Sequence, residues 1–305
     1  MSRASAPGKL NIYFAVGPLR ADGYHSVASV YQALNLLEVV SVTPSAKWEV
    51  ETLGDLTAAQ KALIPDPEQN LVVKAAQALA QSVGLTNPQP MAFQIQKQVP
   101  VAGGMGGGSA DAAAALVALN DAWCLGLEKA ALMEIAAGLG ADVPFSLFGN
   151  TALGTGTGTD LSEMHSANLN WVMVLSETTL STPVVFQKLD ELRSARGEDP
   201  TANPEPTIPQ QLVDALTSGP TEVAKQMHND LHLPALELLP ALRELEKLGD
   251  RLGALRTMVS GSGPTMAMLA KDSDSAVKLS SDLRQRGHRA IACHGPMPGA
   301  TLLEN

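Results

Sequence analysis

Apolar residues along this chain follow two different periods, and each period predicts a different kind of element. In the first hundred residues, apolar and polar side chains mostly alternate, which predicts strands that are half buried. We place these strands at residues 8–17, 27–43, 48–52 and 93–99. A helical period appears from residue 71, where Leu71, Ala75, Ala78 and Leu79 form one apolar stripe. Asn70 precedes this stripe and is a favourable N-cap, so we expect a helix that ends near Ser82.

Helical and strand patterns are mixed in the rest of the chain. Helices are expected to begin at Ser109 and near Leu127, and a third short one follows Asp142, with Pro144 in its first turn. The elements expected beyond residue 170 are strands at 171–175 and 289–293, two strands flanking 260–264, and helices at 209–217, 220–229, 235–248 and 273–286. This order predicts an α+β protein whose second half resembles a small split β-α-β sheet.

Turn residues divide the chain into two regions. Gly154–Thr159 is rich in glycine and threonine, and a new strand pattern begins at Trp171. Because the boundary falls between these features, we expect a first domain at residues 1–163 and a second at 164–305. Residues 194–209 are rich in proline, glutamate and alanine and predict an exposed loop whose order the sequence leaves open.

Composition narrows the possible partners. The 305 residues carry a net charge of −10, which argues against binding to nucleic acid or to a membrane surface through general electrostatics. Aromatic residues make up only 4%, so the core must consist mostly of alanine, leucine and valine. The longest apolar run, Ala112–Leu119, is far too short to span a membrane. Cys124 and Cys293 are expected to be buried and reduced, and we expect a cytoplasmic protein.

The segment from Pro100 to Asn120 carries the strongest chemical signal. It contains five glycines between Gly103 and Gly108, with a strand pattern before them and an alanine-rich helix after them. Glycines let a backbone approach a phosphate closely, and a helix N-terminus offers free N–H groups and a positive dipole end. Ser109 stands where its hydroxyl can cap the helix or reach a phosphate or its metal ion. We therefore predict a phosphate-binding loop.

Two common nucleotide motifs are excluded at this loop. No Gly-Lys-Ser/Thr closes it, so it is not a Walker A loop. The spacing Gly-x-Gly-x-x-Gly is also absent between Gly103 and Asp111, so it is not a dinucleotide-binding fingerprint.

Two further segments are weak signals when each is taken alone. The stretch Val259–Thr265, Val-Ser-Gly-Ser-Gly-Pro-Thr, fits a tight turn as well as a ligand loop. The stretch Ala6–Asn11, Ala-Pro-Gly-Lys-Leu-Asn, contains a lysine that composition alone would place at the surface. In order along the chain, however, these segments and the glycine loop resemble the three motifs of the GHMP kinase superfamily, and this resemblance covers essentially the whole chain.

The resemblance implies a fold, two ligands and a catalytic pair. It implies a two-domain α+β structure, with an N-terminal domain like domain 2 of ribosomal protein S5 and a ferredoxin-like C-terminal domain. It also implies ATP and Mg²⁺, with Asp142 as general base assisted by Lys9, and Ser109 as a metal ligand. The residues implied to hold ATP are Pro100, Gly103, Gly104, Met105, Gly106, Gly107, Gly108 and Ser109.

A passage after the first motif narrows the choice of acceptor substrate. Arg20–His25, Arg-Ala-Asp-Gly-Tyr-His, resembles the members that phosphorylate a cytidyl-diphospho sugar alcohol in non-mevalonate isoprenoid synthesis. Gly140–Phe145 and Ser181–Phe186 resemble the same members, and His228–Leu231 does so more weakly. The implied substrate-binding residues are Asn11, Tyr24, His25, Thr182, Phe186, Gly261, Ser262 and Gly263. Tyr24 and Phe186 would stack on the base, and His25 would hydrogen-bond its edge.

Alternatives remain open at this stage. Another small-molecule kinase of the superfamily, of the mevalonate, homoserine or galactose type, is the main one. A non-catalytic binding protein on the same fold is a second, and a related decarboxylase is a remote third. Asp142 also fits a simple helix cap, and the role of Asp111 in the glycine-loop helix is undecided: it either faces away from the phosphates or helps to hold the metal. The oligomeric state cannot be read from the sequence.

Overall fold

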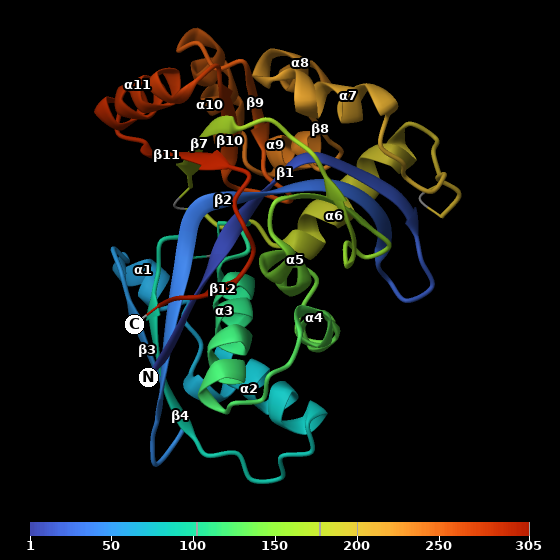
Figure 1. Cartoon of the computed structure of the whole chain (residues 1–305). Helices are drawn as coiled ribbons and strands as arrows, with labels where there is room; N and C mark the ends of the chain where they lie inside the picture. Colours follow the sequence, from blue (N-terminus) through green and yellow to red (C-terminus); the bar gives the residue numbers. More distant parts are fainter. Residues whose placement is uncertain (102, 177, 200, 305) are drawn as a thin grey trace.

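Two long antiparallel strands, β1 (Ser2–Leu19) and β2 (His25–Pro44), run through most of the molecule in the computed structural model (Figure 1). The structure describes residues 1–101, 103–176, 178–199 and 201–304. The pairing of β1 with β2 shifts register between Pro7 and Lys9 and again between Asn11 and Tyr13. Such irregularities bend a strand and redirect its side chains. Lys9 and Asn11 therefore lie between two bends, and their spacing of two residues puts them on one face.

The first sheet is built around this pair, and its strand order is β12-β1-β2-β4-β3, with β5, β6 and β8 attached outside that path. Its other strands are β3 (Glu49–Leu53), β4 (Met91–Gln96), β5 (Thr151–Thr155), β6 (Asp160–Met164), β8 (His228–Asn229) and β12 (Thr301–Leu302). The pairing of β12 with the start of β1 brings the two chain ends close together.

Helices cover one side of this sheet. Figure 1 shows α2 (Leu71–Ser82), α3 (Gly107–Ala122) and α4 (Lys129–Ala137) beside β1, β2 and β4, and short α5 (Val143–Phe148) lies nearby. The core between them contains six alanines of α3 that are fully buried. Small side chains let α3 approach the sheet closely, which confirms the prediction of an alanine-rich core. Asn70 caps α2 through a hydrogen bond to the Val72 N–H, as predicted. Short α1 (Ala58–Lys61) precedes α2.

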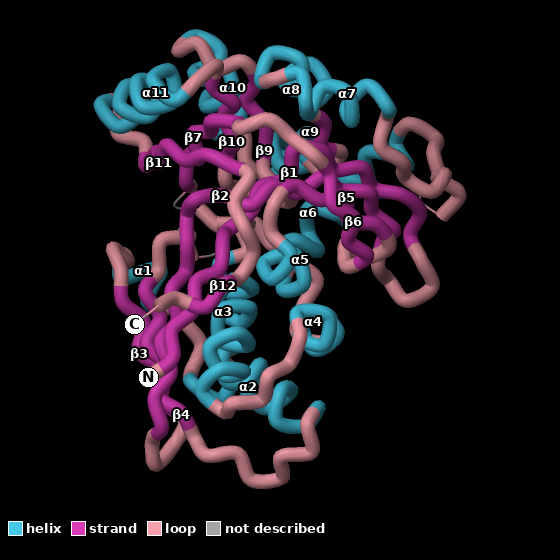
Figure 2. Tube along the Cα trace, viewed as in Figure 1, coloured by secondary structure: helices cyan, strands magenta, loops and turns pink. Residues whose placement is uncertain are grey.

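A second sheet has the strand order β11-β7-β10-β9. Its strands are β7 (Leu169–Leu175), β9 (Arg256–Val259), β10 (Met266–Ala270) and β11 (Arg289–Gly295). The helices of this half are α6 (Thr182–Ala195), α7 (Gln210–Ser218), α8 (Pro220–Gln226), α9 (His232–Leu238), α10 (Ala241–Arg251) and α11 (Ser273–Gln285). Figure 2 shows several of them gathered over this sheet.

The two sheets share a core. Alternate residues of β7 face opposite ways: Trp171 and Met173 pack with Leu10 of β1 and other apolar residues, whereas Val172 and Val174 pack with a second apolar cluster. The Trp171 indole N–H donates a buried hydrogen bond of 2.8 Å to Gln32 of β2. The chain changes sheet between β6 and β7, and the expected domain boundary at residue 163 stays a prediction.

Several expectations from the sequence were wrong in detail. The helix expected at 235–248 is two helices, α9 and α10, with a break at Leu239–Pro240, because proline cannot donate the hydrogen bond that a continuing helix needs. Helix α6 was not predicted, and neither were the two-residue strands β8 and β12. Cys124 is exposed rather than buried, whereas Cys293 is buried and burial raises the pKa of its thiol to about 12.

Ala102 of the glycine loop and Pro200 of the expected loop at 194–209 lie outside the described residues. Within the part of the chain that is described, we find no helix with the length and apolar character that crossing a bilayer requires.

Candidate active site

The glycine loop leads directly into α3. The helix begins at Gly107, two residues before the predicted start at Ser109, and its N-cap is Gly106 with a φ of +71°. This left-handed backbone conformation favours glycine. Of the two roles expected for Ser109, capping the helix is therefore excluded, and contact with a phosphate or its metal ion stays a prediction. The Ser109 hydroxyl makes no hydrogen bond to any described residue, so it is available to a ligand.

A cavity of about 470 Å³ lies against this helix start. All eight residues predicted to hold ATP line it: Pro100, Gly103, Gly104, Met105, Gly106, Gly107, Gly108 and Ser109. The first N–H groups of α3 have no partner within the helix and so are free for an anion here. Apolar side chains of Leu63, Ile64 and Ile95 form another part of the wall. The arrangement suits a molecule with an anionic end and an apolar end.

A buried charge cluster supports the loop from behind. The Lys97 ammonium lies 2.7 Å from Asp111 and 2.9 Å from Glu38, and none of the three side chains is more than 10% exposed. Glu38 also accepts a hydrogen bond from the Val99 N–H, next to the loop. A Cβ placed on Gly107 would lie 3.3 Å from the Lys97 ammonium. Asp111 is thus paired with a lysine that the sequence analysis did not consider, and its two expected roles stay predictions.

Burial dominates the electrostatics of this cluster. Burial, together with the nearby Asp111 and opposed by Lys97, raises the pKa of Glu38 to about 8. Burial also raises the pKa of Asp111, and Lys97 opposes that shift. Sequence reasoning missed Lys97 and Glu38, since neither stands in a recognised motif.

Lys9 and Asp142 meet on the other side of the same loop. The Lys9 ammonium lies 3.5 Å from Asp142 and donates a hydrogen bond of 3.0 Å to Asn11. A Cβ on Gly106 would be 3.3 Å from Lys9, and the Lys9 backbone N–H bonds to the Met105 carbonyl. Asp142 is the N-cap residue of α5, but its side chain makes no capping hydrogen bond. Its carboxylate, 30% exposed, is thus left free for chemistry.

A second cavity, of about 500 Å³, opens beside this pair. Of the predicted catalytic and substrate-binding residues, it is lined by Lys9, Tyr24, His25, Asp142, Thr182, Phe186, Gly261 and Ser262. Gly104 lines both cavities. Gly106, which lines the first cavity, lies beside the pair, since a Cβ on it would be 3.3 Å from Lys9 and 3.9 Å from Asp142. Asn11 and Gly263 do not line it. Asn11 is almost fully buried, and its amide is engaged by Lys9 and by Ser29.

The aromatic wall of this cavity differs from the expected arrangement. The His25 ring itself stacks on Phe186, with centroids 5.2 Å apart and planes inclined by 26°. Tyr24 is 68% exposed, so its ring is free to turn toward a ligand. The stacking of a base between Tyr24 and Phe186 stays a prediction. A residue that the sequence did not reveal, Asp190 of α6, also lines the cavity.

The second glycine loop is tied to its neighbours. The Asn229 amide donates hydrogen bonds of 2.8 Å to the carbonyls of Val259 and Gly261. Ser262 lies 2.9 Å from the Thr182 hydroxyl at the start of α6. A Cβ on Gly104 would lie 3.0 Å from the Gly263 carbonyl oxygen, so the two glycine loops are in contact.

Known proteins share this organisation. The family model described as GHMP kinases N terminal domain matches residues 70–150, and that described as GHMP kinases C terminal matches residues 212–289. The chain belongs to the GHMP kinase family and has its two-domain α+β fold. Membership of a kinase family implies that ATP is a substrate.

Particular relatives carry a more specific name. A protein of Paenarthrobacter aurescens (strain TC1), named 4-diphosphocytidyl-2-C-methyl-D-erythritol kinase, is 46% identical over 312 residues, which cover 99% of this chain and 96% of that one. A protein of Leifsonia xyli subsp. xyli (strain CTCB07) with the same name is 43% identical, with 98% of both chains covered.

Solved structures agree with this likeness. A crystal structure of 4-(cytidine 5'-diphospho)-2C-methyl-D-erythritol kinase superposes with a TM-score of 0.74 at 27% identity, covering 99% of this chain and all of that one. Homoserine kinase from Cytophaga hutchinsonii ATCC 33406 gives a TM-score of 0.72, covering 99% of this chain and 97% of that one, but at 18% identity it shows the fold alone.

Proposed function

We propose that this chain is a 4-diphosphocytidyl-2-C-methyl-D-erythritol kinase, which transfers the γ-phosphoryl group of ATP to the 2-hydroxyl of its acceptor in non-mevalonate isoprenoid synthesis. The observation that carries the proposal is the position of the Lys9–Asp142 pair, which lines the second cavity and lies beside Gly106 of the first. A phosphoryl transfer needs a donor site, an acceptor site and a proton acceptor at their junction.

The reaction follows from these positions. Asp142 accepts the proton of the acceptor hydroxyl, and the resulting oxygen attacks the γ-phosphorus of ATP. The bond from that phosphorus to the bridging oxygen breaks, and ADP leaves with the electron pair. Lys9, 3.5 Å from Asp142, holds the carboxylate in place and stabilises negative charge on the attacking oxygen.

The first cavity suits ATP. The glycine loop and the first N–H groups of α3 would bind the phosphates, and the apolar wall with Leu63, Ile64 and Ile95 would receive the adenine. The only ammonium on this cavity wall is that of Lys97 among described residues, and it already has two carboxylate partners. Charge on the phosphates would thus be balanced by backbone N–H groups, by Lys9 and by a metal ion.

The residues of the first cavity can bind Mg²⁺ only when phosphate oxygens complete the coordination shell of the ion. Among the described residues no group of three acidic, histidine or cysteine side chains is placed to hold a metal. Mg²⁺ commonly binds nucleotide phosphates with one or two protein ligands and several waters. Ser109, whose hydroxyl has no described protein partner, would be such a ligand. The ion would neutralise charge that develops on the transferred phosphoryl group.

The second cavity suits the cytidyl end of the acceptor. Tyr24 and Phe186 would stack on the base, with Tyr24 closing over it from its exposed position. His25 would hydrogen-bond the base edge, and Thr182, Gly261 and Ser262 would contact the rest of the acceptor. Asn11 would act by holding Lys9, and Gly263 would act by shaping the second loop. The ligands of the protein are thus small molecules.

The test is a direct assay with ATP, Mg²⁺ and a panel of alcohols that includes mevalonate, homoserine and the cytidyl acceptor, with product mass as readout. We expect phosphorylation of the cytidyl acceptor and ADP release in equal amounts. An enzyme that phosphorylates only another alcohol would overturn the proposal.

A matched variant tests the base. Asp142→Asn keeps the size of the side chain but removes the proton acceptor, so kcat should fall by about 10³-fold while nucleotide binding persists. Wild-type turnover in this variant would remove Asp142 from the mechanism.

A further inference from the structure

The ring of His25 is held in two independent ways at the wall of the second cavity. Its face stacks on Phe186, and its Nε2 lies 3.1 Å from the Asp190 carboxylate. The stack fixes the plane of the ring, and the hydrogen bond fixes its rotation within that plane. Since the side chain of His25 is only 5% exposed, few other orientations are open to it.

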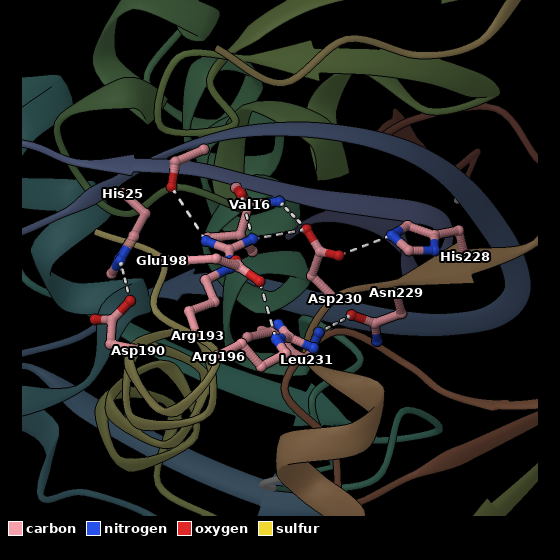
Figure 3. Close-up of polar contacts among 11 residues, drawn as sticks. Val16, His25, Asp190, Arg193, Arg196, Glu198, His228, Asn229, Asp230 and Leu231 are labelled. Atoms are coloured by element: carbon pink, nitrogen blue, oxygen red, sulfur yellow. Dashed lines mark hydrogen bonds and ion pairs between the residues drawn. The ribbon is translucent and has the colours of Figure 1, made fainter. Parts of the chain in front are cut away.

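The two partners of His25 come from one helix face. Phe186 and Asp190 are four residues apart on α6, a spacing that stacks side chains on the same face. Figure 3 shows the Asp190 carboxylate directed at the imidazole. One turn further along, Arg193 donates to the Val16 carbonyl at 2.7 Å and to Asp230 at 3.2 Å. These bonds fasten α6 to β1, so the pair is carried on an anchored element.

The hydrogen bond decides where the imidazole proton lies. An ionised carboxylate only accepts hydrogen bonds, so Nε2 of a neutral His25 must carry the proton. The other ring nitrogen, Nδ1, then has a free lone pair and is an acceptor. No residue in the described part of the chain donates to Nδ1.

We propose that Asp190 is a positioning residue that fixes the tautomer of His25, and thereby makes the cavity select cytosine over uracil. This inference rests on the proposed function and on the expectation that His25 meets the base edge. Cytosine carries an amino group at position 4, which donates to Nδ1, whereas uracil carries a carbonyl oxygen there, which would face a second lone pair. Stacking on an aromatic ring cannot make this distinction, because both pyrimidines offer a flat face.

The first experiment measures the tautomer without turnover. Two-bond ¹H–¹⁵N correlation spectra of the full chain at about pH 8.5, where a free imidazole is neutral, separate the two tautomers. The His25→Gln variant identifies the His25 signals among the six histidines. We expect the Nε2–H form in the wild type and a mixture of both forms in Asp190→Ala. A wild-type protein with the proton on Nδ1 overturns the inference, whichever substrate the enzyme uses.

The second experiment measures selectivity as the ratio of kcat/KM for the cytidyl acceptor to that for its uridyl analogue. In Asp190→Ala this ratio should fall by about tenfold or more, mostly through a higher KM for the cytidyl acceptor. Asp190→Asn retains an acceptor oxygen and should keep most of the selectivity. Glu191→Ala, an exposed neighbour on the same helix, is the matched control and should leave both values unchanged.

The outcomes separate the two claims. A wild-type enzyme that phosphorylates the cytidyl acceptor, together with an unchanged ratio in Asp190→Ala, overturns the role of Asp190 and leaves the proposed function intact. A wild-type enzyme that phosphorylates neither pyrimidine acceptor refutes the proposed function and, with it, the selectivity, while the spectra still decide the tautomer.

Discussion

Two buried lysines lie on opposite sides of the glycine loop, and they have different surroundings. A Cβ on Gly106 would touch Lys9, and one on Gly107 would touch Lys97. Lys97 has two carboxylates at 2.7 and 2.9 Å, in a cluster closed to solvent. Lys9 has one carboxylate, at 3.5 Å, and that carboxylate is 30% exposed.

The difference shows that the number of partners decides what a buried lysine can do. The ammonium group of Lys97 is enclosed by the carboxyl groups of Asp111 and Glu38, so it is suited to supporting the loop. Lys9 keeps a more open arrangement, in which a substrate oxygen can join Asp142 beside the ammonium. Exchanging the two roles would require moving carboxylates rather than lysines.

The largest expected effect comes from Lys9→Met. Removing the ammonium should lower kcat by about 10³-fold, since charge on the attacking oxygen is no longer balanced. Because Asp142 is partly exposed, the free energy of unfolding should change by only about 1 kcal/mol. Steady-state kinetics and urea denaturation of the same preparation measure both quantities. A much lower free energy of unfolding in Lys9→Met would show that Lys9, like Lys97, mainly supports the structure, and would contradict the comparison.

Lys97→Met should instead act on stability. It leaves two carboxylates buried without a cation, and breaking a buried ion pair costs about 3–5 kcal/mol. The midpoint of urea denaturation reports this loss. The triple variant Glu38→Gln, Lys97→Met and Asp111→Asn replaces all three ionisable side chains and should recover a large part of it. An unchanged midpoint in Lys97→Met would show that the cluster contributes nothing.

The pH dependence of the free energy of unfolding is a smaller effect that tests the Lys97 cluster further. Burial raises the pKa of Glu38 in the folded protein to about 8 from an ordinary 4.5, so the folded state binds the extra proton between these values. The resulting stability is complete below about pH 4.5 and is lost as the pH rises through about 8. The slope at intermediate pH is about 1 kcal/mol per pH unit, and Glu38→Gln should flatten it.

Urea denaturation at several pH values between about 6 and 9 measures this slope. Glu51→Gln is the control, since Glu51 is exposed. Parallel curves for wild type and Glu38→Gln would contradict the assignment of the buried proton to Glu38.

The comparison also shows what could be predicted from the sequence. The glycine loop was predicted because a strand, five glycines and a helix form a local pattern that points to anion binding. Lys9 was found through a motif. Lys97 is also a lysine that lies beside the glycine loop. Its two partners, however, are 59 and 14 residues away in the sequence, and no local pattern reveals such contacts.

Helix α6 explains most of what was missed at the acceptor cavity. Val185, Leu189 and Leu192 do follow a helical period, but the segment was interpreted only as a motif, so the helical spacing of Phe186 and Asp190 was missed. Pro240 is a local signal for the break between α9 and α10, which was missed because the apolar residues on both sides continue one helical pattern. The register shifts that orient Lys9 depend on pairing between strands, and a single strand does not reveal them.

Contact between the two glycine loops limits how such enzymes can be recombined. Gly104, with a φ of +69°, faces the Gly263 carbonyl so closely that an added Cβ would lie 3.0 Å from it. A chimera that joins the first half of this chain to the second half of another kinase must therefore reproduce both backbones at this contact. The two loops consequently have to be transferred together, so an engineer who wants a new acceptor should redesign α6 and leave the loops in place.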